Sequence, residues 1–321
     1  MSWSNTQNTA NSSHFIEAEQ YSAFILENLN DGLLPGQFYR EVSDFGTGTN
    51  LHIKTIGTVT LQETSELSPL TYNPIDTGEV SLSITDYIGD AWSVSDVLRQ
   101  DGAQIDALMA MRAQESTRAL QEYHETRFLE VCNSAQTASD LNVINGVPHR
   151  FVASGTNQTI ELGDIIKLKL AFDKANVPTS GRVLIVDPIV AATMDTKFNA
   201  TYAVNRNPEF MTKLGEGFSR DHQFMMNLFG FNIITSNRLP KIASETIDSV
   251  SVTDGVANIA MCIADDNCKP VMHAWRQAPK VESERNKDLR QDEFVTTSRF
   301  GFGPQRVDTL AVVLTSETAM S

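Results

Sequence analysis

The chain has 321 residues and a formal net charge of −15, with 41% hydrophobic and 20% charged residues. A chain of this length can bury a large core, and its composition is that of an ordinary globular protein. The negative charge argues against sequence-independent binding to nucleic acids or anionic membranes, because that binding depends on cations that displace counterions.

Three cysteines without a CxxC pair argue against a disulfide framework and favour a reducing compartment. Residues 1–13 are polar and lack the basic and apolar regions of a secretory signal. No segment reaches the roughly 18–20 apolar residues that a membrane span needs. We expect a soluble protein made in a cytoplasm.

The N-terminal part of the chain predicts one helix and one extended segment. Apolar residues recur at helical spacing over residues 14–29, and Asn30, Asp31 and Gly32 provide the chemistry of a helix end. Residues 38–45 look extended, and residues 46–50 form a turn.

Two strand-like runs follow, over residues 51–62 and 79–85. In the first run Leu51, Ile53, Val59 and Leu61 fall on one face, and in the second Val80, Leu82 and Ile84 do the same. Such alternation predicts half-buried antiparallel strands. Because a two-stranded ribbon is marginally stable alone, this apolar stripe must pack on something else, for which another subunit is a candidate. The connection, with Pro69 and Pro74, is far longer than the about 2–5 residues of a hairpin loop.

Residues 101–135 predict one long helix of roughly 50 Å, with Asp101 as its N-cap. Charged side chains three or four residues apart predict the surface pairs Arg112–Glu115, Glu115–Arg118 and Arg118–Glu122. The predicted apolar face consists of Ile105, Leu108, Met109, Leu120, Tyr123, Phe128 and Leu129.

The rest of the chain predicts a mixed α+β fold. Asn145-Gly146 is a strong turn signal, and residues 201–220 are predicted to be a mobile loop. A helix over residues 162–176 has Ile165, Ile166, Leu168, Leu170 and Phe172 as its apolar positions. A further helix covers residues 188–198. Strands are expected at residues 183–186, 230–236, 259–263, 270–275, 280–298 and 307–314.

No phosphate-binding loop, nucleophile elbow or zinc-protease motif is present in the sequence. We therefore expect no catalytic residues, no cofactor and no bound metal. Cys262, Asp265, Asp266 and Cys268 are the one dense group of metal-ligand types, but a second ligand pair is missing and a turn between strands is favoured. The histidines are scattered, which favours solvated or hydrogen-bonding roles; they are His14, His52, His124, His149, His222 and His273.

Two features leave alternatives open. The run over residues 280–293 interleaves both signs of charge and is either an exposed hairpin or a ladder of ion pairs to a neighbouring copy. Lys54 stands alone in the first strand-like run, where a solubility role is favoured over an isopeptide cross-link to a neighbour.

The order of these elements resembles that of tailed-phage major capsid proteins of the Hong Kong 97-type fold, and short-tailed phage capsids in particular. Residues 177–188 (VPTSGRVLIVDP) are similar to that family's segment in which a helix ends, a strand crosses and the next helix begins. Residues 229–240 (FGFNIITSNRLP) and 300–303 (FGFG) are similar to its later strand segments. No N-terminal scaffolding-like extension is present, so a separate scaffolding protein is expected.

The resemblance implies five parts: an N-terminal arm (1–45), an extended loop (46–86), a peripheral domain with the long helix (87–161), an axial domain (162–279) and return strands (280–321). It implies a shell of hexamers and pentamers around double-stranded DNA, with a portal and a possible decoration protein as partners, and no sequence-specific DNA contact or membrane. The candidate contact residues between subunits are Phe15, Tyr21, Lys54, Glu63, Glu66, Tyr72, Arg112, Arg118, Glu282, Arg285 and Arg290. The alternatives are a cellular nanocompartment shell, a soluble enzyme, and an adhesive or tail-tube protein.

Overall fold

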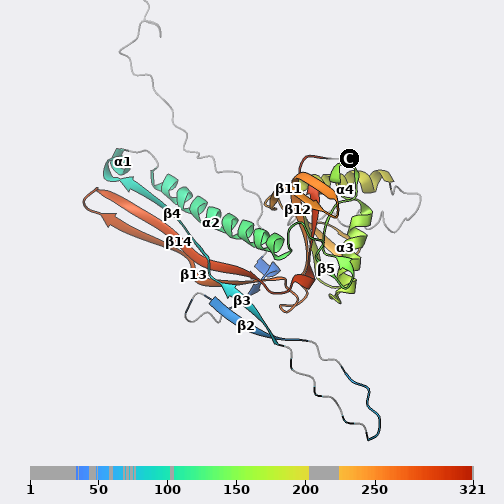
Figure 1. Cartoon of the computed structure of the whole chain (residues 1–321). Coiled ribbons are helices and arrows are strands. Elements are labelled where there is room, and N and C mark those ends of the chain that lie inside the picture. The colour runs from blue at the N-terminus through green and yellow to red at the C-terminus, as the bar shows by residue number, and fades with distance from the viewer. Residues whose placement is uncertain are drawn as a thin grey trace, which may run out of the picture.

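The computed structural model describes residues 34, 36–42, 48, 50–57, 61–67, 69, 72, 75, 77–101, 105–201 and 224–319. In these residues the chain forms an elongated sheet with a long helix beside it, a compact sheet flanked by helices, and a projecting two-stranded arm (Figure 1). The mixed α+β prediction is confirmed. The helix predicted over residues 14–29 lies outside the described residues, as does the predicted loop after Thr201.

The elongated sheet is built on a long hairpin, in which strands β13 and β14 pair antiparallel and the connecting turn spans residues 287–290. Strand β4 pairs antiparallel with β14, and the short β1 pairs parallel with β13. The hairpin over residues 280–293 is confirmed, and from Lys280 onward β13 is mostly exposed on the single chain; the ladder of ion pairs to a neighbouring copy stays a prediction. The strands, in order of pairing, are β1 (Arg40–Glu41), β13 (Val271–Asn286), β14 (Gln291–Pro304) and β4 (Asp86–Ser95).

The long helix α2 (Ile105–Ala135) lies along the elongated sheet and ends beside the compact one (Figure 1). At 1.5 Å per residue it is about 46 Å long. Phe128, Leu129 and Cys132 on its last turns are buried in a cluster with Phe300 and Phe302 of β14. Burying each such large apolar side chain stabilises the fold by about 1.5–3 kcal/mol, so the C-terminal half anchors the helix.

Two details of the predicted long helix are wrong. Asp101 is not its N-cap but the last residue of a separate helix, α1 (Asp96–Asp101), which begins earlier because Ser95 Oγ accepts a hydrogen bond from the Leu98 N–H at 3.3 Å. The predicted apolar face is also interrupted, since Leu108 and Tyr123 are 47% and 44% exposed.

The compact sheet has seven strands, and helices α3 (Leu162–Lys174) and α4 (Pro188–Thr201) contribute side chains to its core. Ile165, Leu168 and Phe172 of α3 are fully buried, as predicted, but Ile166 and Leu170 are each 48% exposed. The strands, in order of pairing, are β7 (Arg150–Val152), β15 (Leu310–Ser316), β12 (Val250–Cys262), β8 (Arg182–Val186), β10 (Phe231–Thr235) and β9 (Phe224–Leu228), with β11 (Lys241–Ile247) pairing on β12.

A buried ion pair ties the end of α2 to the compact sheet. Arg150 of β7 and Glu245 of β11 are 1% and 6% exposed, and two hydrogen bonds of 2.7 Å join them. Arg150 also donates to Asn133 Oδ1 of α2 at 2.9 Å, and the Ser139 N–H donates to Glu245 at 2.8 Å. Burial alone would raise the pKa of Glu245, but these hydrogen bonds hold that pKa below its ordinary value.

The arm consists of β2 (Asn50–Ile56) and β3 (Thr77–Ser83), paired antiparallel with Leu51 opposite Leu82 and Ile53 opposite Val80. The first strand is shorter than the predicted run over residues 51–62. A small hairpin of β5 (Val143–Ile144) and β6 (Val147–Pro148) confirms the predicted turn, since Asn145 and Gly146 have positive φ angles of 49° and 81°. The short 3-10 helices are η1 (Gly36–Phe38), η2 (Thr156–Gln158) and η3 (Val307–Thr309).

The predicted C-terminal return strands lie in both sheets. Strand β14 belongs to the elongated sheet, whereas β15 lies between β7 and β12 in the compact one. Residues 307–309, predicted as strand, form η3 before β15 begins. The division of the chain into five parts stays a prediction.

Candidate functional site

The base of the arm packs on its own chain. Leu51, Ile53 and Val80 pack with the buried Leu82 against Met272 and Ala274 of β13. The predicted alternation is therefore confirmed, but at its base the stripe is covered by the same chain rather than by another subunit.

Two glycines let the arm approach β14 closely. A Cβ added to Gly301 would lie 2.2 Å from the Ser83 carbonyl oxygen, and one added to Gly303 would lie 3.0 Å from Leu82 Cδ1. Contacts below 3.0 Å with backbone atoms cannot be relieved by a side-chain rotation, so Gly301 is required where β3 crosses β14. The FGFG segment thus has a packing role.

The outer face of the arm carries a charge cluster. Lys54 Nζ lies 2.5 Å from Glu79 Oε2, and His52 contacts the other carboxylate oxygen. The hydrogen bond from Lys54 is the main cause that lowers the pKa of Glu79. Lys54, predicted as a contact residue, is thus paired within its own chain and exposed.

Beyond the base, the arm leads away from the body (Figure 1). Its apolar side chains there are exposed. Leu61, Leu67 and Tyr72 are 91%, 100% and 97% exposed, and Ile75 is 79% exposed. We call residues 61–76 the tip. The predicted contact residues Glu63 and Glu66 are exposed in the same segment.

A groove of about 740 Å³ lies where the arm leaves the body. It combines apolar side chains with the cationic Arg40 and Arg306 and with the acidic Asp308, which lies 3.7 Å from Arg306. The lining residues are Arg40, Val42, Leu51, His52, Ile53, Thr55, Ile56, Val80, Asn267, Met272, Gln305, Arg306, Val307 and Asp308.

The far end of the elongated sheet is joined by ion pairs within the chain. Arg285 lies 2.7 Å from Asp96 and 3.0 Å from Asp292, and Arg99 lies 2.8 Å from Asp292. The hydrogen bond from Arg285 lowers the pKa of Asp96. Trp92 of β4 stacks on Phe294 of β14 with ring centroids 4.3 Å apart.

The other predicted contact residues lie at several places on the surface. Arg112 pairs with Asp90 of β4 at 2.8 Å, and Arg118 pairs with Glu122 at 3.0 Å, as predicted for the latter. Glu282 is paired with Lys280 at 2.5 Å on the exposed part of β13. Arg290 stands in the hairpin turn with a φ of 53°. The nine predicted contact residues that the structure describes thus do not lie in one site, and the other two, Phe15 and Tyr21, lie outside the described residues.

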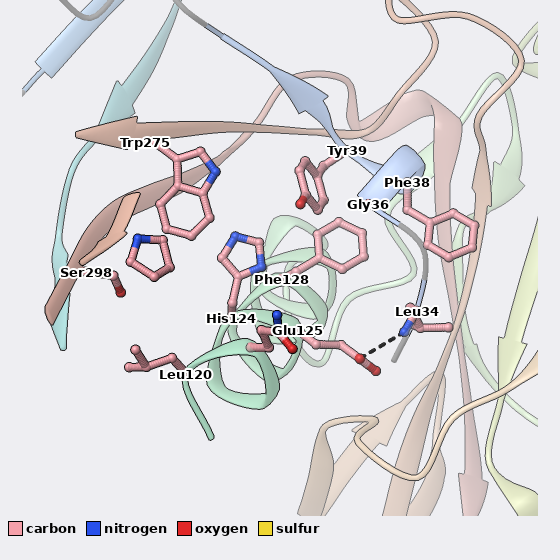
Figure 2. A pocket seen from close by; sticks show the side chains of 12 residues that line it. Leu34, Gly36, Phe38, Tyr39, Leu120, His124, Glu125, Phe128, Trp275 and Ser298 are labelled. Carbon is pink, nitrogen blue, oxygen red and sulfur yellow. Dashed lines mark hydrogen bonds between the residues drawn. The ribbon is translucent and has the colours of Figure 1, made fainter. Parts of the chain in front are cut away.

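A pocket of about 250 Å³ lies between α2, β13 and the segment before β1 (Figure 2). The Leu34 N–H donates to Glu125 at 3.0 Å, as the dashed line shows. Beside the pocket, His124 Nε2 and His273 Nε2 are 3.0 Å apart, and Tyr39 packs against both rings. Burial lowers the pKa of His124 to about 4 and that of His273 to about 3, so both imidazoles are neutral at pH 7.

The described residues hold no group of three or more His, Cys, Asp and Glu side chains that could bind a metal ion. The described helices include none that is long and apolar enough to cross a membrane. The described surface has a long arm with an exposed apolar tip and a groove at its base. Such exposed apolar surfaces are typical of proteins that bind other proteins.

The fold defines the class of protein. The chain superposes on the capsid protein of cyanophage P-SCSP1u with a TM-score of 0.71 and 15% identity, over 99% of this chain and 97% of that one. For the mature capsid of bacteriophage PhiM1 the TM-score is 0.69 with 12% identity, over 98% of both chains. For the structure from Mycobacterium phage Che8 the TM-score is 0.64 with 17% identity, over 94% of this chain and 97% of that one. The architecture is that of phage capsid proteins and is consistent with the Hong Kong 97-type fold.

The family follows from the sequence itself. The model of the phage capsid protein family matches residues 78–315, which is most of the chain, and the chain belongs to this family. None of the curated protein sequences matches it. The chain is a major capsid protein, a structural component of the viral shell rather than an enzyme.

Proposed function

We propose that copies of this chain close into an icosahedral shell of hexamers and pentamers around double-stranded DNA, with the arm of each subunit lying on its neighbour. The observation that carries this proposal is the exposure of Leu61, Leu67, Tyr72 and Ile75 on the tip. Apolar side chains gain about 25 cal/mol for each Å² removed from water, so a tip without a core of its own is stabilised by a neighbouring surface.

The groove at the base of the arm is the receiving surface that we favour for a neighbour's tip. It presents Arg40 and Arg306 beside apolar side chains such as Ile56 and Val307. The tip presents the carboxylates of Glu63 and Glu66 beside apolar side chains. Opposite charges around an apolar centre favour this pairing and fix its register.

The five predicted parts take their capsid roles in this proposal. The arm is the extended loop, the sheet of β4, β13 and β14 with α2 is the core of the peripheral domain, and the compact sheet is the core of the axial domain. The net charge of −15 suits a wall that lies near packaged DNA without binding it tightly. Assembly in the host cytoplasm with a separate scaffolding protein, a portal and a possible decoration protein completes the proposal.

The tip is tested by deleting residues 63–76 and examining the purified protein by circular dichroism, sedimentation and electron microscopy. We expect a folded subunit that no longer forms shells under conditions in which the wild type does. The milder variant Leu67→Ser is compared with Leu289→Ser, which removes a leucine that is 65% exposed in the hairpin turn. Only Leu67→Ser should reduce assembly. Normal shells from the deletion variant would refute the role of the tip, and small wild-type oligomers even with a scaffold would refute the shell.

A further inference from the structure

The pocket beside α2 takes no part in the proposed function. It has a volume of about 250 Å³ and lies between α2, β13 and the segment before β1 (Figure 2). Leu120 of α2 forms part of its apolar wall. The aromatic side chains that line it are Phe38, Tyr39, Phe128 and Trp275. The pocket thus offers an apolar ligand a place between elements that are far apart in the sequence.

The volume and the walls of the pocket select a flat, ring-shaped ligand. An apolar cavity of about 150 Å³ in a folded protein binds benzene, and pockets for drug-sized ligands have about 300–1,000 Å³. A volume of about 250 Å³ therefore suits one ring or two fused rings. Phe38, Leu120 and Phe128 are buried, so this part of the wall is in place without a ligand. Aromatic walls favour an aromatic ligand, because rings attract one another in stacked and edge-to-face arrangements.

One ring nitrogen of the wall is left for a polar group of the ligand. His124 lines the pocket, and its Nε2 atom lies 3.0 Å from His273 Nε2, which leaves His124 Nδ1 for a further hydrogen bond. Whether Nδ1 donates or accepts depends on the tautomer of the ring. A hydroxyl group both donates and accepts, so it matches either tautomer.

The described residues of the wall offer no unpaired charge to an ionic ligand, and no lysine or arginine is among them. The buried Glu125 carboxylate accepts the Leu34 N–H at 3.0 Å and the Ser236 hydroxyl at 3.3 Å, and Arg238 lies 3.9 Å from it. Burial lowers the pKa of His124 to about 4, so this side chain is neutral at pH 7. An ion would lose its hydration here without gaining a counter-charge, which favours an uncharged ligand.

We propose that this pocket is a binding site for one small, uncharged aromatic molecule that carries a hydroxyl group, a phenol or a naphthol in chemical class. Its rings lie among Tyr39, Phe128 and Trp275, and its hydroxyl group bonds to His124 Nδ1. The bound molecule ties the segment before β1 to α2 and stabilises the folded subunit, because the unfolded chain has no such pocket. The site lies within one chain, so the proposal goes beyond the proposed function and does not depend on it.

The test is isothermal titration calorimetry of the unassembled full-length chain with 2-naphthol at pH 7. We expect one molecule to bind per subunit and the Tm to rise with the concentration of 2-naphthol. The anion 2-naphthoate has the same rings and should bind about tenfold more weakly or not at all. His124→Phe keeps a ring in the wall and should weaken the binding of 2-naphthol by about 2–10-fold, the effect of one hydrogen bond.

A matched pair of variants on α2 tests the location of the site. Leu120→Trp fills the pocket and should abolish binding, whereas Leu108→Trp adds the same bulk at an exposed position outside the pocket and should bind like the wild type. If Leu120→Trp does not fold, as judged by circular dichroism, Gln121→Trp at the exposed rim replaces it. The proposal is overturned if the wild type shows no saturable binding or binds 2-naphthoate equally well. It is also overturned if His124→Phe leaves the affinity unchanged, or if the pocket-filling variant and Leu108→Trp bind alike.

Discussion

Acidification from pH 7 to pH 5 should destabilise the subunit through the buried pair of His124 and His273. One neutral imidazole donates its Nε2 proton to the Nε2 atom of the other across 3.0 Å, inside a box of aromatic rings. Protonation of the accepting Nε2 atom would remove the hydrogen bond between the two rings. It would also place a positive charge beside the rings of Phe300, Phe302 and Trp275, away from water. We therefore expect the protonated forms to favour the unfolded chain.

The sign and size of this loss of stability follow from the pKa values of the two histidines. Burial lowers the pKa of His124 from 6.5 to about 4 and that of His273 from 6.5 to about 3. Stability is fully present above the unfolded value of 6.5 and is lost as the pH falls below it, because only the unfolded chain then binds the protons. Between pH 7 and pH 5 each histidine lowers the free energy of unfolding by about 2 kcal/mol, and the two together lower it by about 4 kcal/mol. For a protein of ordinary stability, about 5–15 kcal/mol, this is a large share.

The assay is urea unfolding of the unassembled subunit at pH 7 and pH 5, followed by tryptophan fluorescence. The double variant His124→Gln with His273→Gln should be less stable at pH 7 but should lose about 4 kcal/mol less than the wild type between pH 7 and pH 5. Part of the loss remains, because burial also lowers the pKa of His149. The control His52→Gln removes an exposed histidine of the arm and should keep the wild-type pH dependence. An unchanged loss between pH 7 and pH 5 in the double variant would refute the assignment to this pair.

Further predictions concern the compact sheet and the base of the arm. Glu245→Ala leaves the charge of the buried Arg150 without a partner and should destabilise the fold by about 3–5 kcal/mol in thermal or urea unfolding. The double variant Arg150→Met with Glu245→Leu removes both charges and should recover much of this loss. Equal losses in the two variants would contradict the reasoning. Gly301→Ala places a Cβ 2.2 Å from the Ser83 carbonyl and should loosen the base of the arm, seen as faster proteolysis near β3, while Gly146→Ala, with no atom within 4 Å of its added Cβ, should leave the arm unchanged. Arg285→Ala breaks ion pairs at the surface and should leave the midpoint of urea unfolding nearly unchanged. A clear drop in the midpoint would contradict this expectation.

Local patterns in the sequence predicted the local structure. The alternation of Leu51, Ile53, Val80 and Leu82 gave the two arm strands, because a strand with one buried face must alternate. Asn145-Gly146 gave a turn because both residues tolerate positive φ. The limits of α1 and α2 were missed since Ser95 starts a helix before Asp101 does.

Pairings between distant residues were beyond the reach of the sequence. Arg150 and Glu245 are 95 positions apart, and His124 and His273 are 149 apart, so no local spacing signals their contact. The cover of the arm's apolar stripe by β13 depends on the same long-range packing. A weak signal did exist for Gly301, since two glycines alternating with phenylalanines suggest a close backbone approach.

A photo-cross-linker in place of Tyr72 tests most directly whether the tip lies on a neighbouring subunit. Particles are assembled from a mixture of 14N- and 15N-labelled chains, irradiated, and analysed by mass spectrometry. We predict mixed-isotope cross-links from position 72 to residues around Arg40, Ile56 or Arg306, present in particles and absent in unassembled subunits. The same probe at Tyr87, an exposed tyrosine of β4, is the control. Cross-links that stay within one chain, or that are equal in particles and free subunits, would contradict the account.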